Sequence, residues 1–574
     1  MPGDHHKGAD GVQRHVLILF RHRRPPQSLF QLNHRQKRTI HRKIRYLSRP
    51  CCNAPLSVTQ RKGKSISQGA GMKFLIASFD GLRPDLISKE LTPNIARVQE
   101  LGVTLARHHT VYPSETRAAF PSLVTGAAPV RHGMVGNKFV DRKSTPERYI
   151  DTSDAVLLDR LNKESGGGLM TAPTLGELLA ASDKSLAVLA TNTPGTTRLF
   201  HHKAEDFGHI RLSGHFPEAC TPEDALAQIE TEFGKLPPAA AQGEPDYSGQ
   251  EWITSVFLDY VWPRLSPDVA ILSYGEPDTT SHFHGTGSAT TREIIAYCDA
   301  QFGRVLEWWE AEGRSAGVQL MLASDHGHIT AHTRVSVMDD LRAAGFAPGR
   351  APDPDVDVVV VPGQVGALYL RDRSVDQVSR LGEAMMDQPW CGPIFTAPRN
   401  EVEGIAPGSF ASSLVLCDHD RAPDVYFAFR ADDGLDQFGL GGGTFYDNDR
   451  TAGLGVHGGL HAKELAAVGI VAGAHFRGDG SVSAIPSGIC DLAPTILHGL
   501  GLAVPSTMTG RVLREVFAGA TQNNSEPHVE TEEFEAGLGS FRQTLQRNVI
   551  DGTVYLAGGT ASNATATRKL PAAE

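Results

Sequence analysis

Short apolar runs that each end in polar residues recur along the chain between residues 73 and 473. Five of them are rich in aliphatic and β-branched residues: KFLIASF at 73–79, SLAVLA at 185–190, DVAILSY at 268–274, VQLMLAS at 318–324 and LAAVGIVAG at 465–473. Continuous apolar runs of this length are typical of strands that are buried on both faces. They predict the strands of a largely parallel sheet.

Helical patterns lie between these runs. In TPNIARVQELG at 92–102, Thr92 is a candidate N-cap, Pro93 occupies the first helical position and Gly102 is a stop signal. The segment TREIIAYCDAQFGRVLEWWEAEG at 291–313 places an apolar stripe on one helix face, at Ile295, Cys298, Phe302, Val305 and Trp309. The alternation predicts a three-layer α/β/α fold with a largely parallel central sheet and helices on both faces.

The alternation is interrupted at about 331–450, a stretch rich in Gly, Pro and Asp with its own strand-like pieces DVVVVPG, GALYLRD and DVYFAFR. We expect an inserted cap subdomain there, within a main domain at 72–519. The helical pattern returns with DLAPTILHGLGLAVPSTMTGRVL at 491–513. Residues 520–574 are polar and predict a C-terminal extension that ends in a disordered tail, ASNATATRKLPAAE.

The first 71 residues differ from the rest in charge. They hold a large excess of Lys and Arg, with Asp4 and Asp10 as the only acidic residues, although the whole chain has a net charge of −10. The absence of periodicity predicts a disordered basic extension. A nucleic-acid or membrane-surface arm and a targeting peptide are open alternatives. The segment MKFLIASFDG favours a misassigned start, with Met72 as the native first residue.

Composition narrows the class of protein. The 574 residues, 40% of them apolar, suffice for one large domain with additions. No run approaches the roughly 18 apolar residues of a membrane span, and no export signal is seen, so a cytoplasmic location is expected. The seven cysteines are irregularly spaced, which argues against a disulfide framework or a thiolate zinc site. With 24 histidines present, metal chemistry would rely on imidazole and carboxylate ligands.

Acidic residues follow three of the predicted strands, at Asp80, Asp278 and Asp325. In open α/β sheets the carboxyl ends of the strands meet at one edge, where ligand sites form. Three carboxylates at one edge repel one another and require cations. Each Asp alone is as easily a helix N-cap. Their combination with nearby histidines favours a metal site.

The spacing of the histidines supports this interpretation. Asp278 and His282 stand four apart in EPDTTSHFHG, Asp325 and His326 are adjacent in SDHGH, and His457 lies in VHGGLH, where glycine permits close approach of the backbone. Oxygen and nitrogen ligands without thiolate favour Zn²⁺ over Mn²⁺ or Fe.

A hydroxyl nucleophile is also indicated. The segment YPSETRAAFPSLVTG places Thr116 at a predicted helix start. There the helix dipole and a bound cation both lower the pKa of a hydroxyl group. Ser114 is the competing hydroxyl, and as a helix cap it has a simpler explanation.

The segments FDGLRPD, YPSET, EPDTTSH, SDHGH and HGG together resemble the alkaline phosphatase superfamily, specifically its nucleotide pyrophosphatase/phosphodiesterase branch, over about Met72 to Val516. The resemblance implies an alkaline phosphatase-like fold and two divalent metal ions. By that resemblance one ion is held by Asp278, His282 and His457, and the other by Asp80, Thr116, Asp325 and His326. His284 and His328 flank these residues and stay outside the ligand set.

The resemblance also assigns catalytic roles. The family's Thr nucleophile stands eight residues before the Val of a V-T-G triplet, as Thr116 stands before Val124. RHGMVGN matches the family's HGxxxN segment, which implies that Asn137 stabilises the non-bridging oxygen; by itself Asn137 is a turn residue. Arg117 replaces the usual Phe and Ala119 the usual Asn. Arg117 either binds a substrate phosphate or forms a surface salt bridge.

The function implied is a metal-dependent hydrolase of phosphate esters, either phosphodiesters or nucleotide pyrophosphates, that works through a phospho-threonine intermediate. Its partner is a small-molecule substrate, with no nucleic-acid partner required. A hydrolase of phosphonates such as phosphonoacetate is the alternative within enzymes. A metal-stabilised binding protein that has lost catalysis is the alternative of another class.

Overall fold

The computed structural model describes residues 71–361, 363, 365–448, 450–519 and 527–563. The predicted basic extension, apart from Gly71, therefore lies outside the described residues, as does the segment 564–574. The described residues belong to a single unit. Among them, no helix combines the length and the hydrophobicity that a membrane span requires.

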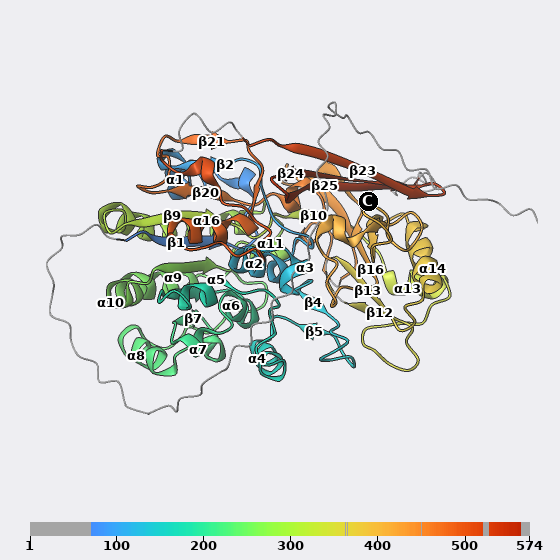
Figure 1. Ribbon diagram of the computed structural model, residues 1–574, viewed down its shortest axis with the longest axis horizontal. Helices are drawn as coiled ribbons and strands as arrows, with labels where there is room; N and C mark the ends of the chain where they lie inside the picture. Colours follow the sequence, from blue (N-terminus) through green and yellow to red (C-terminus); the bar gives the residue numbers. More distant parts are fainter. Residues whose placement is uncertain (1–70, 362, 364, 449, 520–526, 564–574) are drawn as a thin grey trace, which may run out of the picture. The chain divides into compact units, whose positions relative to one another are not determined.

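An eight-stranded sheet lies at the centre of the fold (Figure 1). In spatial order its strands are β21 (Ser481–Ser483), β2 (Val103–Leu105), β20 (Gly469–Ala472), β9 (Val318–Ala323), β1 (Lys73–Phe79), β8 (Val269–Tyr274), β6 (Leu186–Ala190) and β7 (Arg211–Ser213). The five strands from β9 to β7 run parallel, whereas β20 is antiparallel to both of its neighbours. All five predicted strands are present, and the sheet is largely parallel as predicted.

Helices cover both faces of this sheet. Consecutive residues of a strand point to opposite sides, and the strand residues on both sides are apolar. Phe74 and Ile76 of β1 belong to one apolar core, whereas Leu75, Ala77 and Phe79 belong to the other. The first core includes helices α2 (Thr116–Thr125), α5 (Leu175–Ala180) and α16 (Leu492–Gly499); the second includes α1 (Pro93–Leu101), α9 (Ser248–Val256) and α12 (Ala289–Trp308). The three-layer α/β/α prediction is confirmed.

The helix predicted at 92–102 is α1, and Thr92 occupies its N-cap position. The cap itself comes from another helix. Asp299 of α12 accepts hydrogen bonds from the backbone nitrogens of Asn94 and Ile95, at 3.1 and 2.8 Å. A carboxylate far away in sequence thus satisfies two of the donors that a helix start leaves free.

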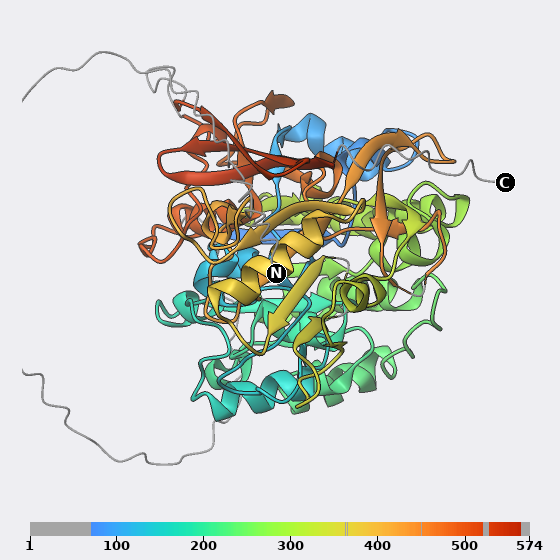
Figure 2. The same ribbon diagram turned by 90° about the vertical axis from the view of Figure 1, so that its right-hand side faces the viewer.

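A second, six-stranded sheet occupies most of the segment predicted as an insertion (Figure 2). Its order is β11 (Pro348–Gly349), β12 (Val358–Val361), β13 (Gly366–Leu370), β16 (Val425–Phe429), β14 (Cys391–Thr396) and β15 (Phe410–Ala411). Helices α13 (Val337–Ala343) and α14 (Val375–Met386) pack on one face. The other face packs against residues of the α/β/α part such as Tyr112 and Phe139.

A four-stranded sheet links the two parts. Its order is β17 (Ala431–Leu435), β18 (Gly441–Tyr446), β10 (Ile329–Arg334) and β19 (Gly455–Val456). Strand β10 follows the SDHGH segment, and β19 directly precedes His457. This sheet therefore brings two distant candidate segments together.

Three antiparallel strands form the C-terminal extension, drawn in dark red in Figures 1 and 2: β23 (Glu530–Leu538), β24 (Phe541–Ile550) and β25 (Thr553–Asn563). Gln543 attaches them to the second sheet, since its side chain accepts from the Ile394 nitrogen at 2.8 Å and donates to the Gly408 oxygen at 2.6 Å. Residues 561–563, expected to begin a disordered tail, instead end β25, where the Asn563 amide donates to the Met386 carbonyl at 2.9 Å.

Candidate metal centre

Five candidate ligands come from the carboxyl ends of neighbouring strands. Asp80 follows β1, Asp278 begins helix α11 (Asp278–His284) after β8, and Asp325 and His326 follow β9. Strands β9, β1 and β8 are adjacent and parallel, so these side chains meet at one edge of the sheet. His282 lies one turn along α11 from Asp278 and joins them.

The first ligand group consists of Asp278, His282, His328 and His457, whose ligand atoms all lie within 4.8 Å of one another. The Nε2 atoms of the three histidines, in that order, lie 3.3, 3.1 and 3.4 Å from Oδ1 of Asp278. A tetrahedral site with bonds of about 2.0–2.1 Å holds its ligand atoms about 3.3 Å apart. The atoms of the first group are therefore spaced as the ligands of one ion.

The second ligand group consists of Asp80, Asp325 and His326, with Thr116 beside it. Nε2 of His326 lies 3.2 Å from Oδ2 of Asp325 and 3.6 Å from Oδ1 of Asp80. The same nitrogen lies 3.2 Å from Oγ1 of Thr116. The two groups are in contact, because the rings of His326 and His457 stack with centroids 3.7 Å apart. All seven ligands predicted from sequence are thus brought together.

Each of the four histidines turns Nδ1 toward a backbone carbonyl. The distances are 2.8 Å from His282 to Gly455, 3.0 Å from His326 to Gly327, 3.0 Å from His328 to Gly81 and 2.8 Å from His457 to Ser114. A carbonyl only accepts, so Nδ1 carries the proton and Nε2 presents a lone pair. A lone pair that faces a carboxylate oxygen at these distances is repelled unless a cation lies between them.

In the described part of the chain, one oxygen of each of the three carboxylates also lacks a hydrogen-bond donor. Among the described residues, Oδ1 of Asp80, Oδ1 of Asp278 and Oδ2 of Asp325 have no hydrogen-bond partner. Burial, and then the charges of Asp325 and Asp278, raise the pKa of Asp80 well above its usual value, although Asn192 donates to its other oxygen at 2.6 Å. Burial lowers the pKa of His282 to about 3, so a proton on that imidazole does not neutralise the carboxylates. Divalent cations fit this donor set.

Thr116 is the hydroxyl presented to the ligand groups. It is the first residue of α2, at the positive end of the helix dipole. The competing hydroxyl, Ser114, is buried; its Oγ donates to the Gly459 oxygen at 2.9 Å and accepts from the Gly458 nitrogen at 3.0 Å. Ser114 therefore holds the loop that carries His457, and it does not cap α2.

Asn137 and Arg117 lie beside the start of α2. Oδ1 of Asn137 accepts from the Arg117 backbone nitrogen at 2.9 Å, and the Asn137 backbone nitrogen donates to Glu115 at 2.6 Å. Among the described residues, the side-chain NH₂ group of Asn137 donates no hydrogen bond that accompanies this contact of Oδ1. The Arg117 guanidinium is not in a surface salt bridge among the described residues; its Nε donates to the Thr152 hydroxyl at 3.0 Å.

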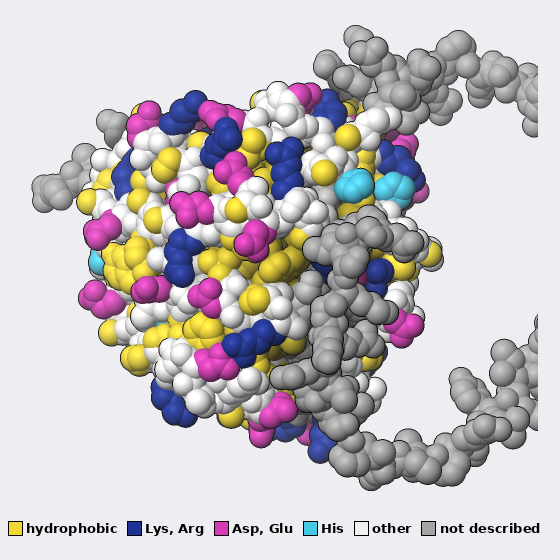
Figure 3. Space-filling view, turned by 90° about the vertical axis from the view of Figure 1, so that its left-hand side faces the viewer, with side chains coloured by type: hydrophobic (Ala, Val, Ile, Leu, Met, Phe, Trp, Pro, Cys, Tyr) yellow, Lys and Arg dark blue, Asp and Glu magenta, His cyan; other side chains and the backbone are white. Residues whose placement is uncertain are grey.

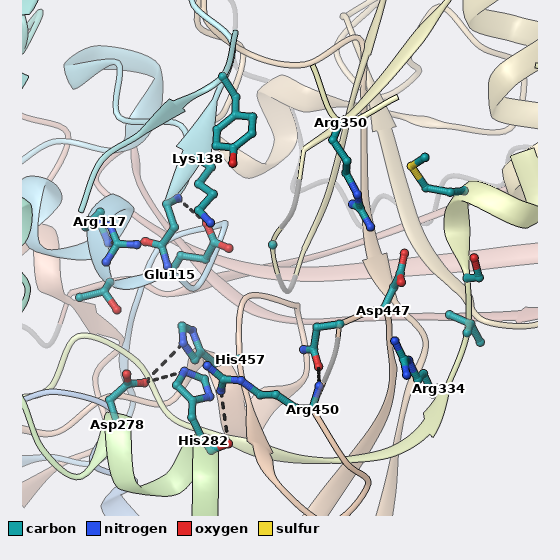
Figure 4. A pocket seen from close by; sticks show the side chains of 18 of the residues that line it. Glu115, Arg117, Lys138, Asp278, His282, Arg334, Arg350, Asp447, Arg450 and His457 are labelled. Carbon is teal, nitrogen blue, oxygen red and sulfur yellow. Dashed lines mark hydrogen bonds and ion pairs between the residues drawn. The ribbon is translucent and has the colours of Figure 1, made fainter. Parts of the chain in front are cut away.

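Thr116 and three members of the first ligand group, Asp278, His282 and His457, border a cavity of about 1230 Å³. Figure 4 shows Asp278, His282 and His457 at one end of it, with Arg117 and Lys138 nearby. The opposite side is lined by residues of the segments 334–350 and 447–450. A cavity of this size accepts a substrate considerably larger than a single phosphate.

His328 is the ligand-type residue that sequence analysis left out. It stands two residues after His326, yet its Nε2 joins the first ligand group instead of the second. Gly81 makes room for its ring, since an added Cβ would lie 2.4 Å from Cε1 of His328, and the glycine has a φ of 70°. The glycine in the segment FDGLRPD was the only local signal of this close approach.

Comparison with protein families identifies the chain. A family model described as type I phosphodiesterase / nucleotide pyrophosphatase matches residues 74–433. The matched range covers more than half of the chain and includes every candidate ligand except His457. The chain belongs to this family. Membership places it in the nucleotide pyrophosphatase/phosphodiesterase branch of the alkaline phosphatase superfamily, as the resemblance implied.

Two curated relatives show how low the sequence identity between this chain and similar proteins is. Ectonucleotide pyrophosphatase/phosphodiesterase family member 7 of Mus musculus is 23% identical over 269 residues, which cover 46% of this chain and 52% of that protein. Ectonucleotide pyrophosphatase/phosphodiesterase 2 of Saccharomyces cerevisiae is 27% identical over 295 residues, or 49% of this chain and 52% of that protein. The matches thus span about half the length of these relatives.

Solved structures share the fold. Murine ectonucleotide pyrophosphatase / phosphodiesterase 5 aligns with a TM-score of 0.54 and 17% identity, over 78% of this chain and 100% of that chain. An inactive form of the same murine protein, in complex with AMP, aligns with a TM-score of 0.53 and 16% identity. At this identity the likeness establishes the architecture alone.

Proposed function

We propose that this protein hydrolyses phosphodiesters or nucleotide pyrophosphates through a phospho-threonine intermediate at Thr116. The observation that carries the proposal is the position of the Thr116 hydroxyl, at the start of α2, 3.2 Å from Nε2 of His326 in the second ligand group, and on the cavity that Asp278, His282 and His457 border. Family membership supports the reaction class. The AMP complex of the murine structural relative supports a nucleotide substrate.

Two divalent ions complete the proposed site, with Zn²⁺ favoured because the ligands are imidazole and carboxylate without thiolate. One ion takes Asp278, His282, His328 and His457, and the other takes Asp80, Thr116, Asp325 and His326. When bound, such ions supply positive charge that lowers the pKa of a hydroxyl and neutralises developing oxyanions.

The side chains have distinct roles in the proposed reaction. Oγ1 of Thr116 forms a bond to phosphorus while the bond from phosphorus to the leaving oxygen breaks. The NH₂ group of Asn137, oriented through its contact with Arg117, donates to the non-bridging oxygen as negative charge develops there. Water then attacks phosphorus and releases Thr116, so that one ester bond is hydrolysed in each cycle. In this proposal the Arg117 side chain, whose Nε donates to Thr152, pairs with a phosphate charge of the substrate.

The proposal is tested by hydrolysis of four substrates with the zinc-loaded full chain and after chelation. The substrates are bis-p-nitrophenyl phosphate, the p-nitrophenyl ester of thymidine 5′-monophosphate, p-nitrophenyl phosphate and phosphonoacetate. We expect faster turnover of the two diesters, which chelation abolishes and Zn²⁺ restores. Preference for phosphonoacetate would instead identify a phosphonate hydrolase. Absence of all turnover with metal bound would favour the binding protein.

Variants at Thr116 test the intermediate. Thr116→Ala should lower kcat on the diesters by on the order of 10³ or more, since the nucleophile is lost. The ion of the first ligand group should remain bound, because Thr116 is not among its ligands. Thr116→Ser keeps a hydroxyl and is the matched control, which should retain substantial turnover. Normal kcat in Thr116→Ala would overturn the assignment.

A further inference from the structure

Asp80 of the second ligand group contacts a side chain that follows β6, a strand whose end carries no candidate ligand. Asn192 lies just beyond the carboxyl end of β6, and its Nδ2 donates to Oδ2 of Asp80 at 2.6 Å. Strand β6 is the neighbour of β8, and β8 is the neighbour of β1, which ends just before Asp80. A further strand end therefore reaches the second ligand group.

Two serine hydroxyl groups hold the amide of Asn192 in place. Ser273 of β8 donates to Oδ1 of Asn192 at 2.7 Å, and Ser78 of β1 donates to Oγ of Ser273 at 2.9 Å. The two serines are register partners in the parallel pair of β1 and β8. Ser78, Ser273, Asn192 and Asp80 are all buried. The geometry of this chain of hydrogen bonds is therefore set by the protein and not by bulk water.

The direction of these hydrogen bonds follows from the chemistry of the groups. A carboxylate only accepts, so the end of the Asn192 amide that faces Asp80 is the NH₂ group. The opposite end, Oδ1, also only accepts, so Ser273 donates to it and its own oxygen accepts from Ser78. Every donor in the chain therefore points toward Asp80, and hydrogen bonds aligned in this way strengthen one another.

Asp325, the other carboxylate of the second ligand group, is held in a similar way. Its Oδ1 accepts from the backbone nitrogen of Gly81 at 2.9 Å. Its Oδ2 lies 3.2 Å from Nε2 of His326, and Oδ1 of Asp80 lies 3.6 Å from the same nitrogen. Neither of these two oxygens has a hydrogen-bond partner among the described residues. In each carboxylate one oxygen is thus held by the protein, and the other faces the ligand group.

We infer that Asn192 is a positioning residue for the ion of the second ligand group, because it holds Oδ2 of Asp80 and so presents Oδ1 to the ion as a single ligand atom. Asn192 is not itself a ligand, since its own oxygen faces Ser273. Groups that hydrogen-bond to metal ligands fix the orientation of those ligands and thereby the affinity for the metal. The inference rests on the proposed function, because it takes the two-ion site as given.

The substitution Asn192→Leu removes both hydrogen bonds of the amide and nearly keeps its shape. Zinc affinity of the full chain is measured by competition with a chromophoric chelator, and the visible spectrum of the Co²⁺-substituted protein reports the donor set. We expect one ion to bind about 10–100-fold more weakly, with a changed Co²⁺ spectrum, and the other ion to keep its affinity. Figure 3 shows exposed Asp and Glu side chains on an outer face of the molecule. Ions bound weakly to such carboxylates are removed by the chelator and do not enter the measurement.

A second and milder variant, Ser273→Ala, tests whether the hydroxyl groups act through Asn192. It removes one neutral hydrogen bond behind the amide and should weaken the same ion by about 2–10-fold. In the Asn192→Leu background the change should have no further effect, because the link from Ser273 to Asp80 runs through Asn192. Ser273→Ala also decides the question alone if Asn192→Leu does not fold.

The matched control is Gln319→Leu. Gln319 is a buried side-chain amide near the start of β9, at the end of the strand remote from Asp325. Its oxygen accepts from the His475 nitrogen at 2.9 Å, and its Nε2 donates to the Gly317 oxygen at 3.0 Å. The change should lower the melting temperature and leave the affinities for both ions at their wild-type values. A merely structural role of Asn192 predicts the same result for Asn192→Leu.

The outcomes distinguish this inference from the proposed function. If the wild type binds two ions and the folded variants Asn192→Leu and Ser273→Ala bind both with wild-type affinity, the inference is wrong, even where diesters are hydrolysed. If both variants weaken one ion but the wild type hydrolyses no ester, the role of Asn192 is supported and the proposed function fails. A wild type that binds a single ion would overturn the inference together with the two-ion site.

Discussion

The substitution His328→Asn tests whether the first ligand group holds its ion through four protein atoms. Nδ1 of His328 donates to the Gly81 carbonyl at 3.0 Å, and an asparagine amide can keep a donor at that position. Nε2, which lies 3.1 Å from Oδ1 of Asp278, has no counterpart in asparagine. The change therefore deletes one candidate ligand atom and preserves the contact that positions the side chain.

The expected magnitude follows from the spacing of the ligand atoms. The three Nε2 to Oδ1 distances in the first ligand group run from 3.1 to 3.4 Å, and that of His328 is the shortest. Nothing in this spacing ranks His328 below His282 or His457. Loss of a residue that merely supports a ligand costs about 10–100-fold in metal affinity. Loss of the ligand atom should cost at least that, or roughly 1.4–2.7 kcal/mol, at one of the two ions only.

Competition with a chromophoric chelator measures the zinc affinity, and the visible spectrum of the Co²⁺-substituted protein reports the donor set. We expect one ion to bind at least 10-fold more weakly in His328→Asn, with a changed Co²⁺ spectrum. The matched control is His284→Asn, on the helix that carries Asp278 and His282, whose Nε2 contacts the Gly243 oxygen at 2.7 Å outside both groups. Wild-type affinity and spectrum in folded His328→Asn would refute the four-ligand group.

Two further predictions concern the site and its support. Asn137→Ala should lower kcat by roughly 10²–10³ at unchanged zinc content, because it removes a donor to the transition state. In Asn137→Asp, which keeps an acceptor for the Arg117 nitrogen, kcat should fall as far. A near-normal kcat in either variant would exclude this role of Asn137. His132 is buried against Ser122, and burial lowers its pKa to about 3. As pH falls, the imidazole of His132 is therefore protonated in the unfolded chain before it is protonated in the folded protein. The free energy of unfolding should fall between about pH 6.5 and pH 3, by up to about 1.4 kcal/mol per pH unit. Calorimetry of the metal-free protein should show a smaller loss of Tm between pH 7 and 5 for His132→Gln than for wild type; parallel curves would contradict this.

The strand ends could be predicted because each signal is local. Asp80, Asp278 and Asp325 each follow a continuous apolar run, and parallel strands bring such ends to one edge whatever the details of the connections. His328 could not be placed in the same way. The turn between His326 and His328 decides which ligand group each of these two histidines faces. The position of His328 depends on the space beside Gly81, which belongs to the end of another strand.

The C-terminal strands were missed for a different reason. Strand β23 has the sequence ETEEFEAGL, and most of its side chains are at least partly exposed. A strand of this kind lacks the continuous apolar run that reveals a buried strand. Its position depends on contacts far away in sequence, such as that of Gln543 with Ile394 and Gly408. The same limit applies to Asp299, which caps a helix that begins some 200 residues earlier.

Features that follow from local sequence can be predicted, whereas features that depend on contacts far away in sequence cannot. This is why the sequence supports a reaction class more firmly than a substrate. The candidate ligands sit on strand ends whose positions follow from the sheet itself. The opposite side of the cavity comes from strands and loops of the inserted segment, in which Arg334, Arg350 and Arg450 are separated by up to 116 residues and show no pattern that distinguishes them from solvated arginines. They line one cavity only because the four-stranded and six-stranded sheets bring them together. Relatives that keep the strand ends but change this segment should therefore keep the chemistry and differ in the substrate that they accept.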